Sequence, residues 1–97
     1  MNYAFHPEAE AELNAGIDWY ESRERGLGLD FATEVEAAVQ RALSFPHAWP
    51  VMLGDIRRAL VHRFPYGVLY AQEPLRVFVI AVMHLRRHPS YWHDRMA

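Results

Sequence analysis

The run Val77-Phe78-Val79-Ile80-Ala81-Val82 constrains the fold more than any other feature of the sequence. Six consecutive apolar residues, most of them β-branched or aromatic, predict a strand that is apolar on both faces. Such a strand should lie inside a sheet and be covered by helices on one side. Residues 68–71 predict a neighbouring strand, and the branched and aromatic residues 56–64 predict a third. Because the connections are short, residues 56–81 should form an antiparallel meander.

Two amphipathic helices are predicted ahead of this sheet. The first spans about residues 7–25, with Pro7 at the first helical position, where its missing N–H costs nothing. The second begins near Leu29 or Asp30, carries a continuous apolar stripe and ends at Pro46. Gly26-Leu27-Gly28 stops the first helix, and so short a connection implies an antiparallel helical hairpin.

The N-terminal residues 3–5 are apolar and predict a short edge strand. The expected fold class is therefore α+β, with an N-terminal short strand, an antiparallel helical hairpin, and an antiparallel β-meander sheet with a C-terminal basic segment. With 97 residues, of which 52% are hydrophobic, the chain can bury one core, so we expect a single domain over residues 1–97.

Composition excludes several classes of protein. There is no cysteine, so disulfides and thiolate metal sites are unavailable. No apolar stretch approaches the roughly 20 residues of a membrane-spanning helix. Glu8, Glu10 and Glu12 follow the N-terminus too closely for a signal peptide. We therefore expect a cytoplasmic protein with no membrane association.

The net charge of −2 conceals an asymmetry between the two halves of the chain. Residues 1–50 hold nine carboxylates and three arginines (3 − 9 = −6), and residues 51–97 hold seven arginines and three carboxylates (7 − 3 = +4). We expect the glutamates of the helices, Glu21 among them, to form ordinary solvated faces. The basic half is suited to an anionic partner, either nucleic-acid phosphates or an acidic protein segment.

Chemistry-bearing side chains concentrate between His84 and Arg95, where twelve positions hold three arginines, three histidines, a tyrosine and a tryptophan. Such a cluster could bind RNA, pair with an acidic partner segment, or cleave a phosphodiester by proton transfer beside a guanidinium. Each residue also has a structural interpretation. His84 would be a hydrogen-bonded structural histidine, and Tyr91 and Trp92 would cap the core. Arg86 and Arg87 should point opposite ways, so that one pairs with a helix glutamate.

A metal site is not expected. His84 and His88 would face one ion only on a helix, and Pro89 argues against a helix there. No nucleotide-binding loop or zinc pattern is present, so we expect neither a metal nor a cofactor.

Taken in order, these elements resemble the RelE/ParE superfamily of bacterial toxins, the toxic half of type II toxin–antitoxin pairs. The resemblance covers essentially the whole chain, and it rests on an ordered set of short motifs. They include Trp19-Tyr20-Glu21, Gly26-Leu27-Gly28, Ile56-Arg57-Arg58, Phe64-Pro65-Tyr66, Val68-Leu69-Tyr70, His84, Arg86-Arg87, Pro89, Tyr91-Trp92 and Arg95. The resemblance implies a helical hairpin on a twisted antiparallel sheet, a cognate antitoxin that wraps the toxin, and operator DNA bound only through the antitoxin.

Two branches of the superfamily imply different targets. The branch that resembles RelE cuts messenger RNA in the ribosome, and Arg58, Arg87 and Tyr91 match parts of its catalytic set, with His84 able to assist. Gly67 and Leu85, however, stand where those nucleases typically carry basic residues. The branch that resembles ParE inhibits DNA gyrase by binding and needs no catalytic residues. The motifs from Phe64 to Trp92 favour this branch.

Three hypotheses follow: a gyrase-binding toxin, a ribosome-dependent endonuclease, and an inactive toxin-like domain that only binds its antitoxin. The catalytic candidates, needed only by the nuclease, are Arg58, His84, Arg87 and Tyr91. The residues expected to contact the target or the antitoxin are Arg57, Arg63, Arg86, Trp92 and Arg95.

Overall fold

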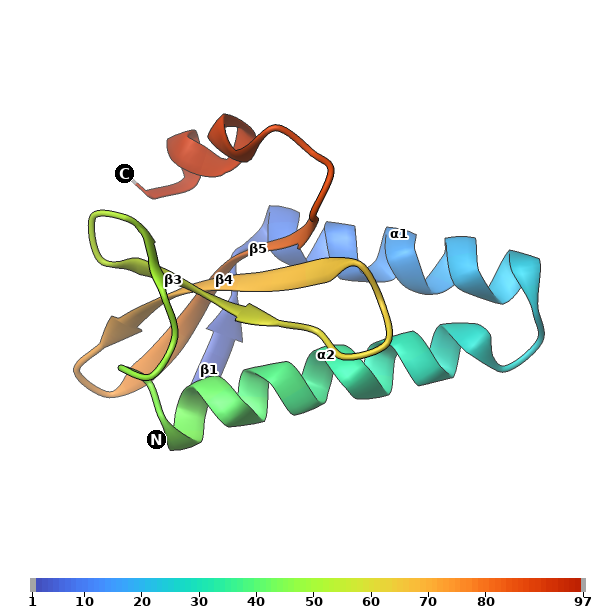
Figure 1. Ribbon diagram of the computed structural model, residues 1–97, viewed down its shortest axis with the longest axis horizontal. Helices are drawn as coiled ribbons and strands as arrows, with labels where there is room; N and C mark the ends of the chain where they lie inside the picture. The colour runs from blue at the N-terminus through green and yellow to red at the C-terminus, as the bar shows by residue number, and fades with distance from the viewer. Residues whose placement is uncertain (1, 97) are drawn as a thin grey trace.

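The computed structural model describes residues 2–96 and places one five-stranded sheet between two helical layers (Figure 1). The chain runs through β1 (Asn2–Phe5), α1 (Pro7–Arg23), α2 (Leu27–Ser44), β2 (Val51–Leu53), β3 (Ile56–Leu60), β4 (Tyr66–Glu73), β5 (Arg76–His84) and the 3-10 helix η1 (Pro89–Met96). The strand order is β1-β5-β4-β3-β2. Strand β1 is parallel to β5, and the other neighbouring pairs are antiparallel. The predicted α+β fold class is confirmed.

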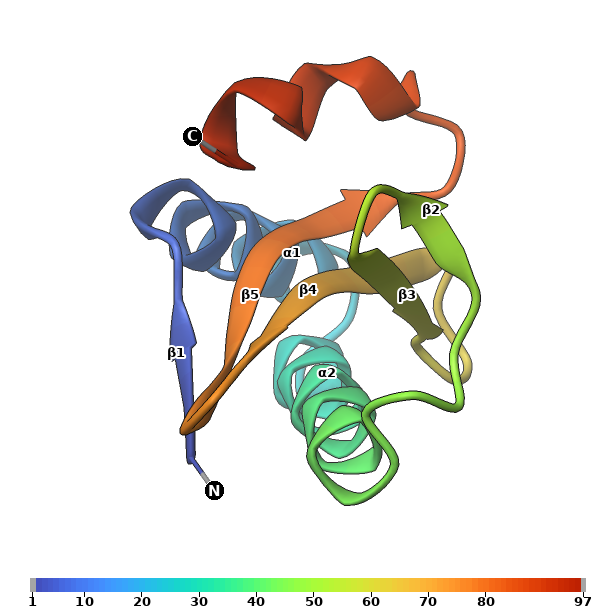
Figure 2. The same ribbon diagram turned by 90° about the vertical axis from the view of Figure 1, so that its left-hand side faces the viewer.

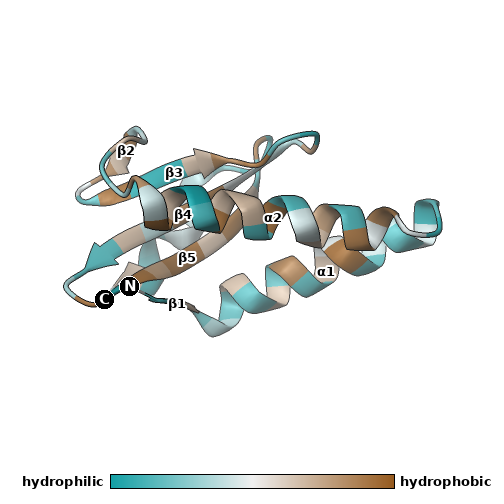
Figure 3. Cartoon of the chain, turned by 90° about the horizontal axis from the view of Figure 1, so that it is seen from below, coloured by the Kyte–Doolittle hydropathy of each residue, from teal (hydrophilic) through white to brown (hydrophobic). Residues whose placement is uncertain are grey.

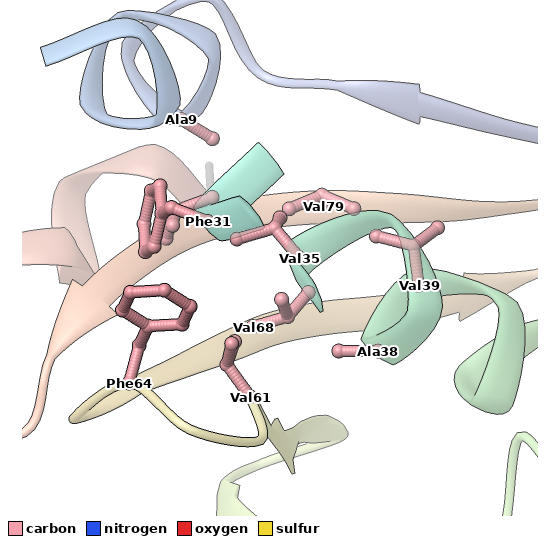
Figure 4. Packing of buried hydrophobic residues seen from close by; sticks show 10 residues of the cluster. Ala9, Phe31, Val35, Ala38, Val39, Val61, Phe64, Val68 and Val79 are labelled. Carbon is pink, nitrogen blue, oxygen red and sulfur yellow. The ribbon is translucent and has the colours of Figure 1, made fainter. Parts of the chain in front are cut away.

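The sheet has an apolar cluster on each face. On the hairpin face, Phe31, Val35 and Val39 of α2 pack against residues of the sheet and its connecting loops (Figure 4). On the opposite face, Trp92 of η1 is 1% exposed and packs on Leu69. Figure 2 shows η1 lying across the sheet from α2. Strand β5 is hydrophobic along most of its length (Figure 3), as expected for a strand that is covered on both faces.

Strand β5 occupies the position that its apolar run predicted, between β1 and β4. Its register against β4 shifts between Leu69 and Tyr70, which pair with Ala81 and Val79. Ile80 is therefore the extra residue of a β-bulge, and Ile80 and Ala81 both belong to the cluster beneath η1. The bulge bends the C-terminal end of β5, the part of the strand that leads into the basic segment.

The helix boundaries differ from the expected ones around the hairpin turn. Helix α1 ends at Arg23 instead of residue 25, and α2 begins at Leu27 instead of Leu29 or Asp30. Gly28 lies inside α2 instead of ending α1. A Cβ at this position would meet the backbone oxygen of Ile17 in α1 at 2.6 Å. This glycine therefore permits close packing of the two helices. The chain reverses at Gly26, which has a φ of 88°. Glycine adopts such a positive φ more readily than any other residue.

One further boundary and one further element differ from the expected ones. Strand β3 ends at Leu60 instead of residue 64, since the chain turns through Arg63, which has a positive φ of 71°. The short edge strand β2 was not predicted, because its three residues are too few to show alternation. Between His84 and His88 the chain forms no helix, as Pro89 indicated; the 3-10 helix η1 begins at Pro89 itself, where a proline loses no hydrogen bond.

Glu21 was expected to be simply solvated, and it instead closes the hairpin. Its carboxylate accepts hydrogen bonds from the backbone N–H groups of Gly26 and Gly28, at 3.0–3.1 Å. These donors lie at the start of α2, where a negative charge is favourable. Within residues 2–96, no helix combines the length and the apolar character that a membrane span needs.

The contact between Gly16 and Phe31 generates a prediction about stability. A Cβ at Gly16 would meet the Phe31 ring at 2.5 Å, and that ring packs against Tyr20, Phe64 and Tyr66. We expect Gly16→Ala to lower the free energy of unfolding by about 1–2 kcal/mol, because overpacking outweighs the roughly 1 kcal/mol gain in helix propensity. Urea denaturation is the measurement. Asn14→Ala, at an exposed position of α1, is the control and should be neutral or stabilising. A more stable Gly16→Ala protein would contradict this packing.

Candidate functional site

The basic C-terminal segment follows the end of β5, and the last part of this strand is paired with β4 but not with β1. Strand β1 covers β5 only as far as the pair Phe5 and Val79, after which the chain turns into α1. Beyond that point two side chains bind the β5 backbone. A Glu12 carboxylate oxygen accepts from the Val82 N–H at 3.0 Å, and an Arg95 Nη1 donates to the Ile80 carbonyl at 3.1 Å. A carboxylate and a guanidinium thus make the backbone hydrogen bonds that a neighbouring strand would otherwise make with β5.

Glu12 and Arg95 also bind each other with bidentate geometry. The Nη1–Oε1 distance is 2.9 Å, and the Nη2–Oε2 distance is 3.1 Å. Their side chains are only 8% (Arg95) and 14% (Glu12) exposed. The Nε atom of Arg95 lies 3.2 Å from a carboxylate oxygen of Glu8, without hydrogen-bond geometry. Paired charge-assisted hydrogen bonds of this kind are strong and fix the orientation of both groups. The two Arg95–Glu12 hydrogen bonds therefore connect η1 to α1.

Tyr91 lies beneath two guanidinium groups. The Cζ of Arg87 is 3.7 Å from the centre of the Tyr91 ring, and that of Arg95 is 5.0 Å away. Arg87 also approaches a Glu12 carboxylate oxygen at 3.6 Å. The Tyr91 hydroxyl is buried and has no hydrogen-bond partner among residues 2–96. Burial raises the pKa of this hydroxyl well above its ordinary value, and the nearby Glu12 carboxylate raises it further. Tyr91 is therefore protonated at neutral pH.

A pocket of about 390 Å³ opens beside this network, between α1 and the ends of β4 and β5. It is lined by Glu12, Ala15, Gly16, Trp19, Tyr20, Tyr66, Val82, His84 and Arg87. The His84 ring packs edge-on to Tyr66, with ring centres 5.1 Å apart. Its Nδ1 accepts a hydrogen bond from the Arg86 backbone N–H at 3.1 Å. His84 thus has the structural hydrogen bond that was one of its expected roles, and it also faces the pocket.

The structure brings some of the predicted residues together. His84 and Arg87 line the pocket, and Arg87 covers Tyr91 beside Arg95. Of the adjacent arginines, Arg87 pairs with a glutamate of α1, as one of the two was expected to do, while Arg86 is exposed. These residues form one network at the C-terminal end of β5.

Other predicted residues lie apart from this network. Arg57 donates to the carbonyl oxygens of His47 and Trp49, and so holds the loop before β2. Arg63 is 3.4 Å from Asp30 at the start of α2.

Arg58 and Trp92 lie on the other face of the sheet. The stem of Arg58 packs so close to Gly67 that a Cβ there would meet its Cδ at 2.8 Å. Strand alternation places this contact on the face beneath η1, away from the pocket. Trp92 lies in the core on that same face, so it caps the core as one interpretation of the sequence expected. Its contact with a target or an antitoxin stays a prediction.

Glu12 is the residue that sequence reasoning missed. Glu12-Leu13 belongs to the motif set of the resemblance, but Glu12 was assigned no role in the site, because its partners are 70 and 83 positions away. One signal was present: Glu12 lies between Ala9 and Leu13 near the apolar side of α1, where an unpaired carboxylate would be costly. The complementary signal was Arg95, the one arginine after Pro89.

Comparison with known proteins places this geometry in context. A solved structure described as the chromosomal ParDE TA system from P. aeruginosa matches with a TM-score of 0.74 and 15% sequence identity. The match covers 89% of this chain and 97% of that chain, so the two share a fold. No curated protein sequence matches.

The family is shown by sequence. Residues 3–89 match the family model described as the ParE toxin of type II toxin-antitoxin system, parDE. The protein is therefore a toxin of the type II toxin–antitoxin class. The chain belongs to the ParE toxin family, and the resemblance to the ParE-like branch is confirmed.

The Glu12–Arg95 pair generates a second prediction. We expect Arg95→Met to lower the free energy of unfolding by about 3 kcal/mol, because it leaves a largely buried carboxylate without its main partner. Arg76→Met is the matched control: Arg76 pairs with Glu73 at 2.6 Å, but both side chains are about 40% exposed, so the loss should stay below about 1 kcal/mol. Urea denaturation compares the two. Equal losses would show that the buried pair does not anchor η1.

Proposed function

We propose that this toxin inhibits DNA gyrase by binding to it, and that a ParD-type antitoxin neutralises it by binding the toxin. Family membership supports a growth-inhibiting role. The gyrase target follows from the resemblance to the ParE branch, whose members act without catalytic residues. A toxin with this target acts in the cytoplasm, where the bacterial chromosome is replicated.

The arrangement of the candidate nuclease residues is the observation that favours a gyrase-binding toxin over a nuclease. A general acid or base must reach the proton that it transfers. The Tyr91 hydroxyl is buried, with Arg87 and Arg95 stacked over its ring, so it does not reach a substrate proton. Arg58 lies on the opposite face of the sheet from the pocket that contains His84 and Arg87. The four candidates therefore do not face one reacting bond.

The face around Arg58 offers little positive charge to a phosphate. A nuclease of the RelE type would be expected to carry further basic residues at the positions of Gly67 and Leu85. Here the glycine makes room for the Arg58 stem, and the Leu85 side chain lies beside the same glycine. Electrostatic stabilisation of a phosphodiester transition state needs several such groups aimed at one site. This face favours binding over cleavage.

An antitoxin partner is proposed on the same basis. The family description names the parDE system, and the P. aeruginosa structure is described as a ParDE system. The C-terminal half of this chain has a net charge of +4 (7 − 3), which suits an acidic antitoxin segment. Operator DNA would then be bound through the antitoxin and not by this chain alone.

The nuclease remains the second candidate because His84 and Arg87 line the same pocket. A histidine can transfer a proton, and a partly exposed guanidinium beside it can stabilise developing negative charge. This alternative makes Arg87 and Tyr91 indispensable, whereas the binding hypothesis does not.

The two functions predict different first effects in cells. When the toxin is induced alone and synthesis is pulse-labelled over the first minutes, we expect DNA synthesis to fall while translation continues. Purified toxin should inhibit supercoiling by gyrase. Tyr91→Phe should keep its potency within about twofold, because only a buried hydroxyl without a partner is removed.

Other outcomes would assign a different function. An early fall in translation, abolished by both Arg87→Ala and Tyr91→Phe, would establish the nuclease. Continued growth with neither synthesis affected would identify an inactive toxin-like domain.

A further inference from the structure

The pocket beside α1 has features of a protein interface that the network around Arg95 does not explain. Trp19 stands at its edge with 52% of its surface exposed, although tryptophan is costly to leave in water. Tyr20 and Tyr66 supply two more aromatic walls, and Gly16 and Val82 are buried behind them. Tryptophan, tyrosine and arginine are the residues that most often anchor binding between proteins.

The size of the pocket suits one large side chain. Its volume of about 390 Å³ lies at the lower end of the range of roughly 300–1,000 Å³ that holds ligands. The small side chain of Ala15, which is exposed on α1 and lines the pocket, leaves this space open at the surface of the helix. An aromatic or leucine side chain could lie between Trp19 and Tyr66, with its backbone continuing over the rim.

The charges around the opening indicate what should flank that side chain. Arg23 stacks over Trp19 at 4.3 Å on one side of the pocket. Arg87 lines the pocket on another side, with 55% of its side chain exposed. The Glu12 carboxylate in the pocket is already bound by Arg95 and the Val82 N–H. The rim therefore presents guanidinium groups to an incoming acidic segment.

We propose that this pocket receives one large apolar side chain from an acidic, extended segment of the antitoxin. The proposal rests on the proposed antitoxin partnership and adds the residues that would hold it. Trp19, Tyr20 and Tyr66 enclose the side chain, and Arg23 and Arg87 pair with carboxylates on either side of it. Burial of Trp19 in the complex removes its apolar surface from water.

Filling the pocket tests the proposal without disturbing the core. Ala15 is exposed on α1 and lines the pocket, so Ala15→Trp places a large ring in the space for the antitoxin side chain. The matched control is Asn14→Trp, which adds the same residue at an exposed position of the same helix outside the pocket. The probe is the full-length antitoxin encoded beside the toxin gene, titrated by calorimetry. We expect Ala15→Trp to weaken its binding at least about 30-fold and Asn14→Trp to leave it within threefold.

Fluorescence supplies a second measurement that does not depend on the filling variant. Trp92 is buried and Trp49 is half-buried, so Trp19 should account for the change in emission when the antitoxin binds. We expect a blue shift and protection from acrylamide quenching in the native toxin. Both should be lost in Trp19→Phe, which keeps an aromatic wall.

The outcomes separate the pocket from the partnership. If the native toxin does not bind this antitoxin, the proposed function fails and the pocket proposal fails with it. If the native toxin binds and Ala15→Trp binds equally well, with Trp19 still quenched in the complex, the pocket proposal is wrong while the antitoxin partnership stands. If Ala15→Trp, folded by circular dichroism, keeps the antitoxin but no longer inhibits gyrase, the pocket belongs to the target and the proposal is overturned.

Discussion

The ion pair between Glu12 and Arg95 joins three parts of the chain that are far apart in sequence. Glu12 comes from α1, the backbone groups it helps to cover come from β5, and Arg95 comes from η1. The pair covers the β5 edge that faces β1, because β1 ends opposite Val79 while β5 continues to His84 paired with β4 alone. Unpaired backbone groups there would be costly, so two charged side chains bind them. The position of η1, and of every residue on it, depends on this arrangement.

The same pair determines which basic groups remain available at the surface. Arg95 is used to hold η1, and Arg87 is drawn over Tyr91 toward the same carboxylate. Elsewhere Arg57 binds two loop carbonyls and Arg63 faces Asp30. Much of the charge asymmetry between the two halves of the sequence is thus complementarity within the molecule. The acidic hairpin meets part of the basic half directly, through ion pairs of Glu12 and Asp30 with arginines of the second half.

Local patterns in the sequence were sufficient for the helical hairpin and the meander. The apolar stripe of α2 and the run from Val77 to Val82 predict those elements because their burial is periodic or complete. The site was harder to predict, since its contacts join residues about 70 to 80 positions apart. Arg95 was included among the binding residues for its charge, but its structural role becomes visible only with Glu12 beside it. Gly28 was misassigned as a helix stop because a glycine that ends a helix and one that lets two helices touch look alike in sequence.

The distribution of roles over the two faces of the sheet bears directly on mechanism. A catalytic site must keep its polar groups free to meet the substrate, whereas a scaffold uses them to bind its own backbone and charges. Here the hydroxyl of Tyr91 is enclosed, Arg95 is paired, and Gly67 accommodates the stem of Arg58. Exposed basic and aromatic groups do occur together beside the pocket, where Arg23 stacks on the exposed Trp19 and the partly exposed Arg87 covers Tyr91. Exposed aromatic and guanidinium groups of this kind contribute to affinity for another protein, and they do so without any reaction at the site.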